Sequence, residues 1–260
     1  MIAWDVAAKR GPERGKMDFF YREARRSGVE LLVAFNPSVG SRCPQRPCRR
    51  PSARRFTHAF KAFRRRYPDQ RVIVAWNEAN HRSQPTRKSP KAAAAYYNVV
   101  RRYCRGCRIV AADVLDESNM TRWLKAFRRY AKRPRIWGLH NYRDTNPRRG
   151  QKGGSTRRFL RYITRGEVWL TETGGIVEFM LPSGRTLFPF NQGRAESNTH
   201  RMFELAKQHR RRIKRLYVYH WQQSSFFNRF DSGLLASDGT ARPAYYAVLD
   251  QLTRSQYFKP

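Results

Sequence analysis

The stretch VIVAWNE, residues 72–78, is the part of the sequence that decides the fold. It opens with an apolar run, VIVAW, of the kind found in strands that are covered on both faces, and such strands belong to parallel sheets. The run then ends in two polar residues, Asn77 and Glu78. A carboxylate at the end of an apolar strand indicates a site at the carboxyl edge of the sheet.

Similar apolar runs recur along the chain, with helical periodicity between them. The other runs are IAWDVA near the start, VELLVAFN (29–36), IVAADVL (109–115), IWGLHNY (136–142), VWLTET (168–173) and LYVYHWQ (216–222). The helical segments are a stripe of Phe56, Phe60, Phe63 and Tyr67, a helix opened by Ser89 and Pro90 that runs through Tyr103, and segments near 121–130, 156–164, 196–211 and 243–252. This alternation predicts an α/β fold with parallel strands.

Polar and aromatic residues stand at the ends of most predicted strands. They are Asn36, Asn77 and Glu78, His140 and Tyr142, Glu172, and Trp221. An open doubly wound sheet would also fit seven strands, but side chains at the carboxyl ends of strands converge on one site in a (β/α)8 barrel. We therefore predict a (β/α)8 TIM barrel-like fold, as a partial barrel of seven recognisable strands. Residues 1–260 are expected to form a single catalytic domain.

Two of these strand ends carry glutamates, Glu78 and Glu172, and a pair of carboxyl groups points to glycosidic chemistry. One carboxylic acid protonates the leaving oxygen, and in retaining enzymes a second carboxylate about 5 to 5.5 Å away attacks the anomeric carbon. Strands remote in sequence can bring two glutamates together across the mouth of one barrel. A plain strand-end carboxylate remains the alternative for Glu172.

The residues around both glutamates resemble a known group of enzymes. AWNEANH (75–81) and WLTETGG (169–175) are similar to the two catalytic strand ends of clan A glycoside hydrolases. HNY (140–142) and YHWQ (219–222) resemble strands 6 and 8 of that clan, and the segment 233–249 is similar to the closing segment of family 39 and family 5 type members.

The resemblance implies a retaining glycoside hydrolase with Glu78 as the acid/base and Glu172 as the nucleophile. It implies no cofactor and no metal, and a polysaccharide or oligosaccharide as the substrate. The residues expected to bind substrate are Asn36, Asn77, His140, Tyr142 and Trp221. By this resemblance, Asn77 corresponds to the residue that donates a hydrogen bond to the sugar 2-hydroxyl. Tyr142 corresponds to the residue that orients the nucleophile, and Trp221 to the residue that stacks on the sugar. The alternative to substrate binding for His140 is a structural role in which its side chain is hydrogen-bonded.

The chain departs from the clan at its start. Aligned by these motifs, IAWDVA corresponds to strand 2, so strand 1 and its helix are missing from this sequence. We expect the chain to be N-terminally truncated relative to the family. An incomplete barrel leaves unpaired strand edges. The second hypothesis is therefore a non-catalytic carbohydrate-binding barrel, which keeps the site but has lost activity together with strand 1.

Charge is the most unusual bulk property. Lys and Arg number 54 against 19 Asp and Glu, a formal net charge of +35. Such a field attracts polyanions, among them acidic glycans and nucleic acid. The basic residues are spread over almost every segment, which favours solvated surface cations. A polyanion or nucleic-acid binder remains the third hypothesis, although no specific nucleic-acid partner is expected.

Four cysteines form two close pairs, Cys43 with Cys48 and Cys104 with Cys107. The first pair follows a predicted strand and the second precedes one, so a shared zinc ion is disfavoured and two local disulfides are expected. Disulfides favour a secreted or cell-envelope protein over a cytosolic one, although no signal peptide and no membrane span are recognisable.

Residues 176–190 predict a β-hairpin that turns at Ser183–Gly184.

Overall fold

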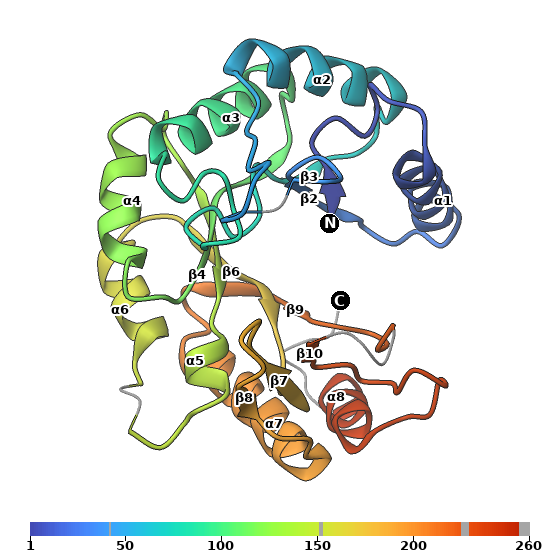
Figure 1. Ribbon diagram of the computed structural model, residues 1–260, viewed down its shortest axis with the longest axis vertical. Coiled ribbons are helices and arrows are strands. Elements are labelled where there is room, and N and C mark those ends of the chain that lie inside the picture. Colours follow the sequence, from blue (N-terminus) through green and yellow to red (C-terminus); the bar gives the residue numbers. More distant parts are fainter. Residues whose placement is uncertain (42, 151–152, 225–228, 255–260) are drawn as a thin grey trace. The chain divides into compact units, whose positions relative to one another are not determined.

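The computed structural model describes residues 1–41, 43–150, 153–224 and 229–254, and most of its elements are labelled in Figure 1. The chain divides into two compact units. The first contains Met1–Leu139 and Arg161–Trp169, and the second contains His140–Leu160 and the chain from Leu170 onward. Two of the three boundaries fall within strands, since His140 is the last residue of one strand and Leu170 is in the middle of another, and the third falls within a helix, Ser155–Tyr162.

Strands and helices alternate in the first unit, as the sequence predicts. In chain order its elements are β1 (Ile2–Ala3), α1 (Pro12–Arg26), β2 (Leu32–Asn36), α2 (Ala53–Arg66), β3 (Val72–Val74), α3 (Pro90–Tyr103), β4 (Arg108–Leu115), α4 (Met120–Arg128), β5 (Ile136–His140) and the start of β6 (Glu167–Thr173). The strands follow the order β1-β2-β3-β4-β5-β6. Val72 lies opposite Leu32 on one side and Arg108 on the other, both in parallel register.

An aromatic cluster forms the core beneath this sheet. Phe56, Phe60 and Phe63 of α2 are fully buried and surround Phe35 of β2, with ring centroids 5.1 to 6.0 Å from that of Phe35. Spacings of three and four residues place the α2 rings on one face of the helix. Burial of each ring contributes about 1.5–3 kcal/mol to folding. The predicted packing of this stripe on the sheet is confirmed.

The second unit contains the end of β6 and the elements around it. These are α5 (Tyr142–Thr145), most of α6 (Ser155–Tyr162), β7 (Glu178–Met180), β8 (Thr186–Phe188), α7 (Gln192–Gln208), β9 (Ile213–Val218), β10 (Phe230–Asp231) and α8 (Pro243–Arg254). Strands β7 and β8 are antiparallel, and their turn closes with the Gly184 N–H donating to the Leu181 carbonyl at 2.9 Å. The predicted hairpin is therefore confirmed. Strand β10 extends it into a small sheet of order β10-β7-β8.

Two glycines after β6 allow the backbone of the second unit to pack closely. A Cβ atom at Gly174 would collide with the Tyr219 carbonyl oxygen, and one at Gly175 would collide with the Ala195 carbonyl oxygen. The backbone next to β6 also pairs with the segment after β9, since the Tyr219 N–H donates to the Thr173 carbonyl at 2.8 Å. The pair of glycines in WLTETGG is thus a steric requirement of this packing.

The order of strands along both units is β1-β2-β3-β4-β5-β6-β9, with helices between them. The fold is an α/β fold consistent with a partial (β/α)8 barrel, and this prediction is confirmed. Several strand ends differ from expectation. The first strand has two residues only, β3 ends at Val74, and Tyr142 begins α5. Strand β9 ends at Val218, before the predicted Trp221.

Both expected disulfides are present, Cys43–Cys48 and Cys104–Cys107. The second joins the end of α3 to the start of β4. Among the residues described by the structure, no helix is both long and apolar enough to span a lipid bilayer.

Candidate active site

Glu78 lies just beyond β3, in a segment that remains hydrogen-bonded to both neighbouring strands. The Asn77 N–H donates to the Phe35 carbonyl of β2 at 2.8 Å. The Ala75 N–H donates to the Val110 carbonyl of β4 at 3.1 Å. The Ala79 N–H donates to the Asp113 backbone carbonyl of β4 at 2.8 Å. The sheet therefore holds the backbone on both sides of Glu78, and the buried Asn77 is fixed with it.

The backbone of Glu78 has a left-handed conformation, with φ at 42°. This region is uncommon for residues other than glycine, and it costs about 1–2 kcal/mol for an L-amino acid. Such residues persist where the surrounding structure constrains them, and they gather at functional sites. The Glu78 side chain is 18% exposed, so its carboxyl group can still reach solvent.

Asn80 supplies much of this constraint. It is fully buried, donates through Nδ2 to the Leu115 carbonyl at 2.8 Å, and accepts through Oδ1 from the Leu115 N–H at 2.8 Å. Its backbone carbonyl also accepts from Nδ2 of Asn119 at 3.0 Å. The loop that follows Glu78 is thus bonded to the end of β4. Asn80 was not among the predicted site residues, although it lies in the AWNEANH motif.

His81 lies between two carboxyl groups of the first unit. Its Nδ1 atom is 3.4 Å from Oε2 of Glu78, and its Nε2 atom is 3.6 Å from Oε1 of Glu117. Nδ1 also lies 2.7 Å from the Ser83 hydroxyl oxygen. Burial by itself lowers the pKa of His81, but the hydrogen bond to Glu78 and the negative charges of Glu78 and Glu117 outweigh it, so the pKa is raised.

His81 was not among the predicted site residues. The sequence signal that could have identified it is its position three residues after Glu78. This spacing places both residues in a single turn, in which the His81 N–H donates to the Glu78 carbonyl at 2.7 Å. The contact with Glu117 could not be inferred from spacing, because Glu117 follows β4 and reaches His81 only in the folded unit.

Asn36 is the last residue of β2, as predicted. Its carbonyl accepts a hydrogen bond from the Trp4 N–H at 2.9 Å. Its side-chain Oδ1 is buried and accepts no hydrogen bond from the described part of the chain. A buried amide oxygen in this state is unusual, and it is an acceptor at the carboxyl edge of the sheet that the described residues leave unused.

In the second unit, Glu172 is held by a tyrosine and faces a histidine. The Tyr142 hydroxyl donates to Oε1 of Glu172 at 3.0 Å, from the first residue of α5 to a residue near the end of β6. Nδ1 of His140 is 3.8 Å from Oε2 of Glu172, too long for a hydrogen bond but close enough for an electrostatic interaction. The structure thus brings three predicted residues of this unit together, Glu172, Tyr142 and His140.

Aromatic packing supports the Tyr142 ring. It meets Phe230 edge to face, with ring centroids 5.3 Å apart, and Phe230 meets Phe179 of β7 in the same way at 5.4 Å. Edge-to-face pairs of this kind contribute about 0.5–1.5 kcal/mol beyond burial. The hairpin β7–β8 therefore stabilises the position of the tyrosine that bonds Glu172.

Trp221 lies in the segment after β9 and not on the strand itself. It is 61% exposed, and its ring meets Tyr245 edge to face at 5.9 Å. An exposed indole supported on one edge leaves a broad apolar surface open to solvent.

Comparisons with known proteins show what this chain is similar to. Residues 51–244 match the family model described as glycosyl hydrolase catalytic core. No curated protein matches the chain by sequence. Several solved structures are similar in fold at low sequence identity.

GH10 from Paenibacillus barcinonensis is 12% identical with a TM-score of 0.66, over 97% of this chain and 85% of that one. An endo-1,4-beta-xylanase from Caldicellulosiruptor owensensis is 13% identical with a TM-score of 0.62, over 90% and 82%. A family 39 glycoside hydrolase from Bacteroides cellulosilyticus is 16% identical with a TM-score of 0.64, over 98% of this chain and 57% of that one. At these identities the likeness concerns the fold.

Proposed function

The chain belongs to the glycosyl hydrolase catalytic core family and is a glycoside hydrolase, and from this premise we propose that it acts by the retaining mechanism. Glu78 is the acid/base and Glu172 is the nucleophile. The substrate is a poly- or oligosaccharide whose O-glycosidic bond is cleaved by double displacement, and the mechanism uses no cofactor. It requires the two carboxyl groups to lie about 5 to 5.5 Å apart when substrate is bound.

In the first step Glu172 attacks the anomeric carbon while Glu78 transfers its proton to the glycosidic oxygen. The carbon–oxygen bond breaks, the leaving sugar departs as an alcohol, and a covalent glycosyl ester forms on Glu172. In the second step Glu78, now ionised, removes a proton from water as the water oxygen attacks the same carbon. Glu172 leaves as a carboxylate, and the anomeric configuration is retained.

The observation that carries this proposal is the hydrogen bond from Tyr142 to Glu172. A nucleophilic carboxylate must be aimed at the anomeric carbon, and the Tyr142 hydroxyl at 3.0 Å fixes the position of one of its two oxygens. The left-handed backbone of Glu78 supports its assignment independently, because strain at a strand end is typical of residues placed for chemistry.

The remaining predicted residues take supporting roles in the proposal. Asn77 donates to the sugar 2-hydroxyl, Asn36 and His140 line the subsite, and the exposed Trp221 provides an apolar face for sugar stacking. Hydrogen bonds to the 2-hydroxyl strengthen as the oxocarbenium-like transition state forms, so Asn77 contributes to kcat more than to binding.

Glu172→Gln tests the nucleophile. We expect turnover to fall about 10³-fold or more while sugar binding persists, since the amide keeps the shape of the side chain but cannot attack. Glu178→Gln is the matched control, an exposed glutamate of β7 that should leave turnover unchanged. Nuclear magnetic resonance of the first-formed product reports its anomeric configuration, and an inverted product would exclude the double displacement.

Glu78→Ala tests the acid/base. With an activated aryl glycoside, the first step needs little acid assistance, so the glycosyl ester should accumulate and turnover should be rescued by added azide. A glycosyl azide of retained configuration is the expected product. If turnover falls equally on aryl glycosides and on natural glycans, and azide does not restore it, Glu78 has a structural role. Binding without hydrolysis in the wild-type chain would indicate the non-catalytic carbohydrate-binding alternative.

The substrate panel should begin with xylans and include acidic glycans. Xylan is the first choice because structural neighbours include endo-1,4-beta-xylanases. Acidic glycans follow from the net charge of +35, which raises the local concentration of anionic chains. Hydrolysis of an acidic glycan that declines steeply with salt would identify charge as a specificity factor.

The two disulfides support an exported protein, in the secreted or cell-envelope fraction, because such bonds persist in oxidising compartments. Fractionation of expressing cells, with thiol labelling of each fraction, tests this location.

We further propose that both compact units form one catalytic domain. A single calorimetric transition whose van't Hoff and calorimetric enthalpies agree is the expected result.

A further inference from the structure

The first unit contains a large cleft at the edge of the sheet opposite to Glu78. Its volume is about 1160 Å³, and it is lined by the end of α3, the turn Cys104–Cys107, the start of β4, the segment before β5 and Glu167 at the start of β6. These are the amino ends of the strands, whereas Glu78 follows the carboxyl end of β3. The cleft is therefore separate from the acid/base residue of the proposed hydrolase.

The cleft carries a concentrated positive charge. Six of its basic residues are exposed and form no ion pair with a carboxylate among the residues that the structure describes: Arg101, Arg102, Arg105, Lys132, Arg133 and Arg135. A concave wall of low dielectric focuses the field of such charges, so the potential inside exceeds that over a flat basic surface.

The acidic groups near the cleft are already engaged. Glu167, the acidic residue of the lining, accepts a hydrogen bond from the Trp169 indole N–H at 3.0 Å. Arg108, a seventh basic residue of the lining, is paired with Glu30, and its guanidinium lies over the Trp169 ring at 5.8 Å. The charge of the other six is thus left for a ligand.

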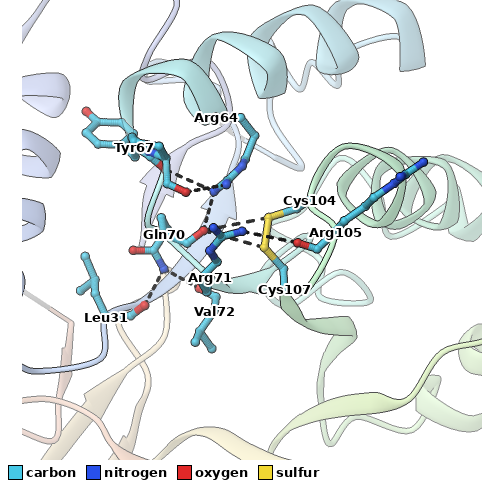
Figure 2. The surroundings of a disulfide bond; sticks show 10 residues. Leu31, Arg64, Tyr67, Gln70, Arg71, Val72, Cys104, Arg105 and Cys107 are labelled. Atoms are coloured by element: carbon cyan, nitrogen blue, oxygen red, sulfur yellow. Dashed lines mark hydrogen bonds between the residues drawn. A yellow bond between two sulfur atoms is a disulfide. The ribbon is translucent and has the colours of Figure 1, made fainter.

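A disulfide holds the turn that presents Arg105 (Figure 2). Cys104 is buried and bonded to Cys107, and Arg71 donates through Nη1 to the Arg105 carbonyl at 3.4 Å. The Arg105 side chain extends away from the disulfide in this view. Because the backbone of the turn is restrained on both sides, less conformational entropy is lost when Arg105 binds an anion.

We propose that this cleft binds an oligophosphate, either free or as the phosphate chain of a nucleotide. Guanidinium groups match phosphate oxygens in paired hydrogen bonds. Six uncompensated cations in one cleft call for a ligand that concentrates several negative charges in a small volume. A chain of linked phosphates does so, whereas a polyuronate carries one charge per sugar and places few of them within the cleft.

Titration calorimetry of the full chain with sodium tripolyphosphate at low ionic strength tests the proposal. Arg105→Ala/Arg135→Ala should weaken binding at least about tenfold, because two charge-assisted contacts are lost. Arg210→Ala/Arg211→Ala removes the same charge from exposed positions in the second unit and should leave affinity within about twofold. Equal weakening by both double variants would overturn the proposal and assign binding to the overall charge.

Further ligands and variants distinguish the remaining possibilities. If adenosine triphosphate binds as tightly as tripolyphosphate, the result supports the phosphate chain of a nucleotide as the ligand of this site. If it binds more weakly, the result supports a free oligophosphate as the ligand. An oligouronate of equal length that binds as tightly would overturn the choice of phosphate. Glu172→Gln should bind tripolyphosphate like the wild type, so failure of the hydrolase proposal leaves this one testable. Cys104→Ser/Cys107→Ser should weaken binding, with circular dichroism to confirm folding.

Discussion

The Tyr142 hydroxyl donates a hydrogen bond of 3.0 Å to Oε1 of Glu172, and the Tyr142 ring is itself packed against Phe230. The donor comes from the first turn of α5 and the acceptor from β6. The carboxylate is thereby oriented by a side chain whose own position is determined by a third element, β10. This arrangement is what a nucleophile needs, since small errors of aim cost large factors in rate.

Tyr142→Phe should lower kcat/KM by about 10- to 100-fold, because a hydrogen bond to a charged group contributes about 1.5–3 kcal/mol. The ring packing against Phe230 is preserved, so the loss of stability should not exceed the contribution of this one hydrogen bond. Steady-state kinetics on the best glycan measures the effect. Tyr246→Phe, at an exposed position of α8, is the control and should match the wild type. Unchanged kinetics for Tyr142→Phe would separate this tyrosine from the reaction.

His81→Gln should change the pH dependence of stability. The raised pKa of His81 means that its protonated form stabilises the folded chain. That contribution is fully present below the ordinary value of 6.5 and is lost as pH rises through the higher folded pKa. Urea unfolding at about pH 5.5 and about pH 9 should therefore show a larger wild-type advantage at the lower pH. An advantage that grows with pH would contradict the ion pairs of His81.

Phe63→Ala should destabilise the protein by about 3–5 kcal/mol, because it opens a cavity in the aromatic cluster around Phe35. Denaturant unfolding followed by tryptophan fluorescence measures the loss. Phe20→Ala, at a residue that is 56% exposed, should change stability by no more than about 0.5 kcal/mol. Similar effects for both would place the core of the first unit elsewhere.

Gly175→Ala and Gly15→Ala should have opposite effects. The added Cβ at Gly175 would collide with the Ala195 carbonyl oxygen, so the backbone must shift and stability should fall. Gly15 lies within α1 with open space around it, and alanine there should stabilise by about 0.5–1 kcal/mol through helix propensity. Thermal unfolding of the two variants, compared with the wild type, measures both signs in one experiment.

Much of the fold follows from local sequence. Apolar runs that end in polar residues predicted the strands, and the stripe of Phe56, Phe60 and Phe63 predicted the packing of α2. The ends of the elements were less predictable. Tyr142 continues an apolar run in sequence but begins α5, and Trp221 follows β9, because tertiary hydrogen bonds decide where a strand stops pairing.

The sequence by itself determined which polar residues follow the apolar runs, and with them the candidates Glu78, Glu172 and Tyr142, because strand periodicity and residue type are local properties. Only the tertiary structure decided that Glu78 adopts a left-handed backbone, that His81 lies between two carboxylates, and that Phe230 supports Tyr142. These features depend on contacts between segments remote along the chain. Such contacts form only when burial of the core brings the segments together, so no local pattern encodes them.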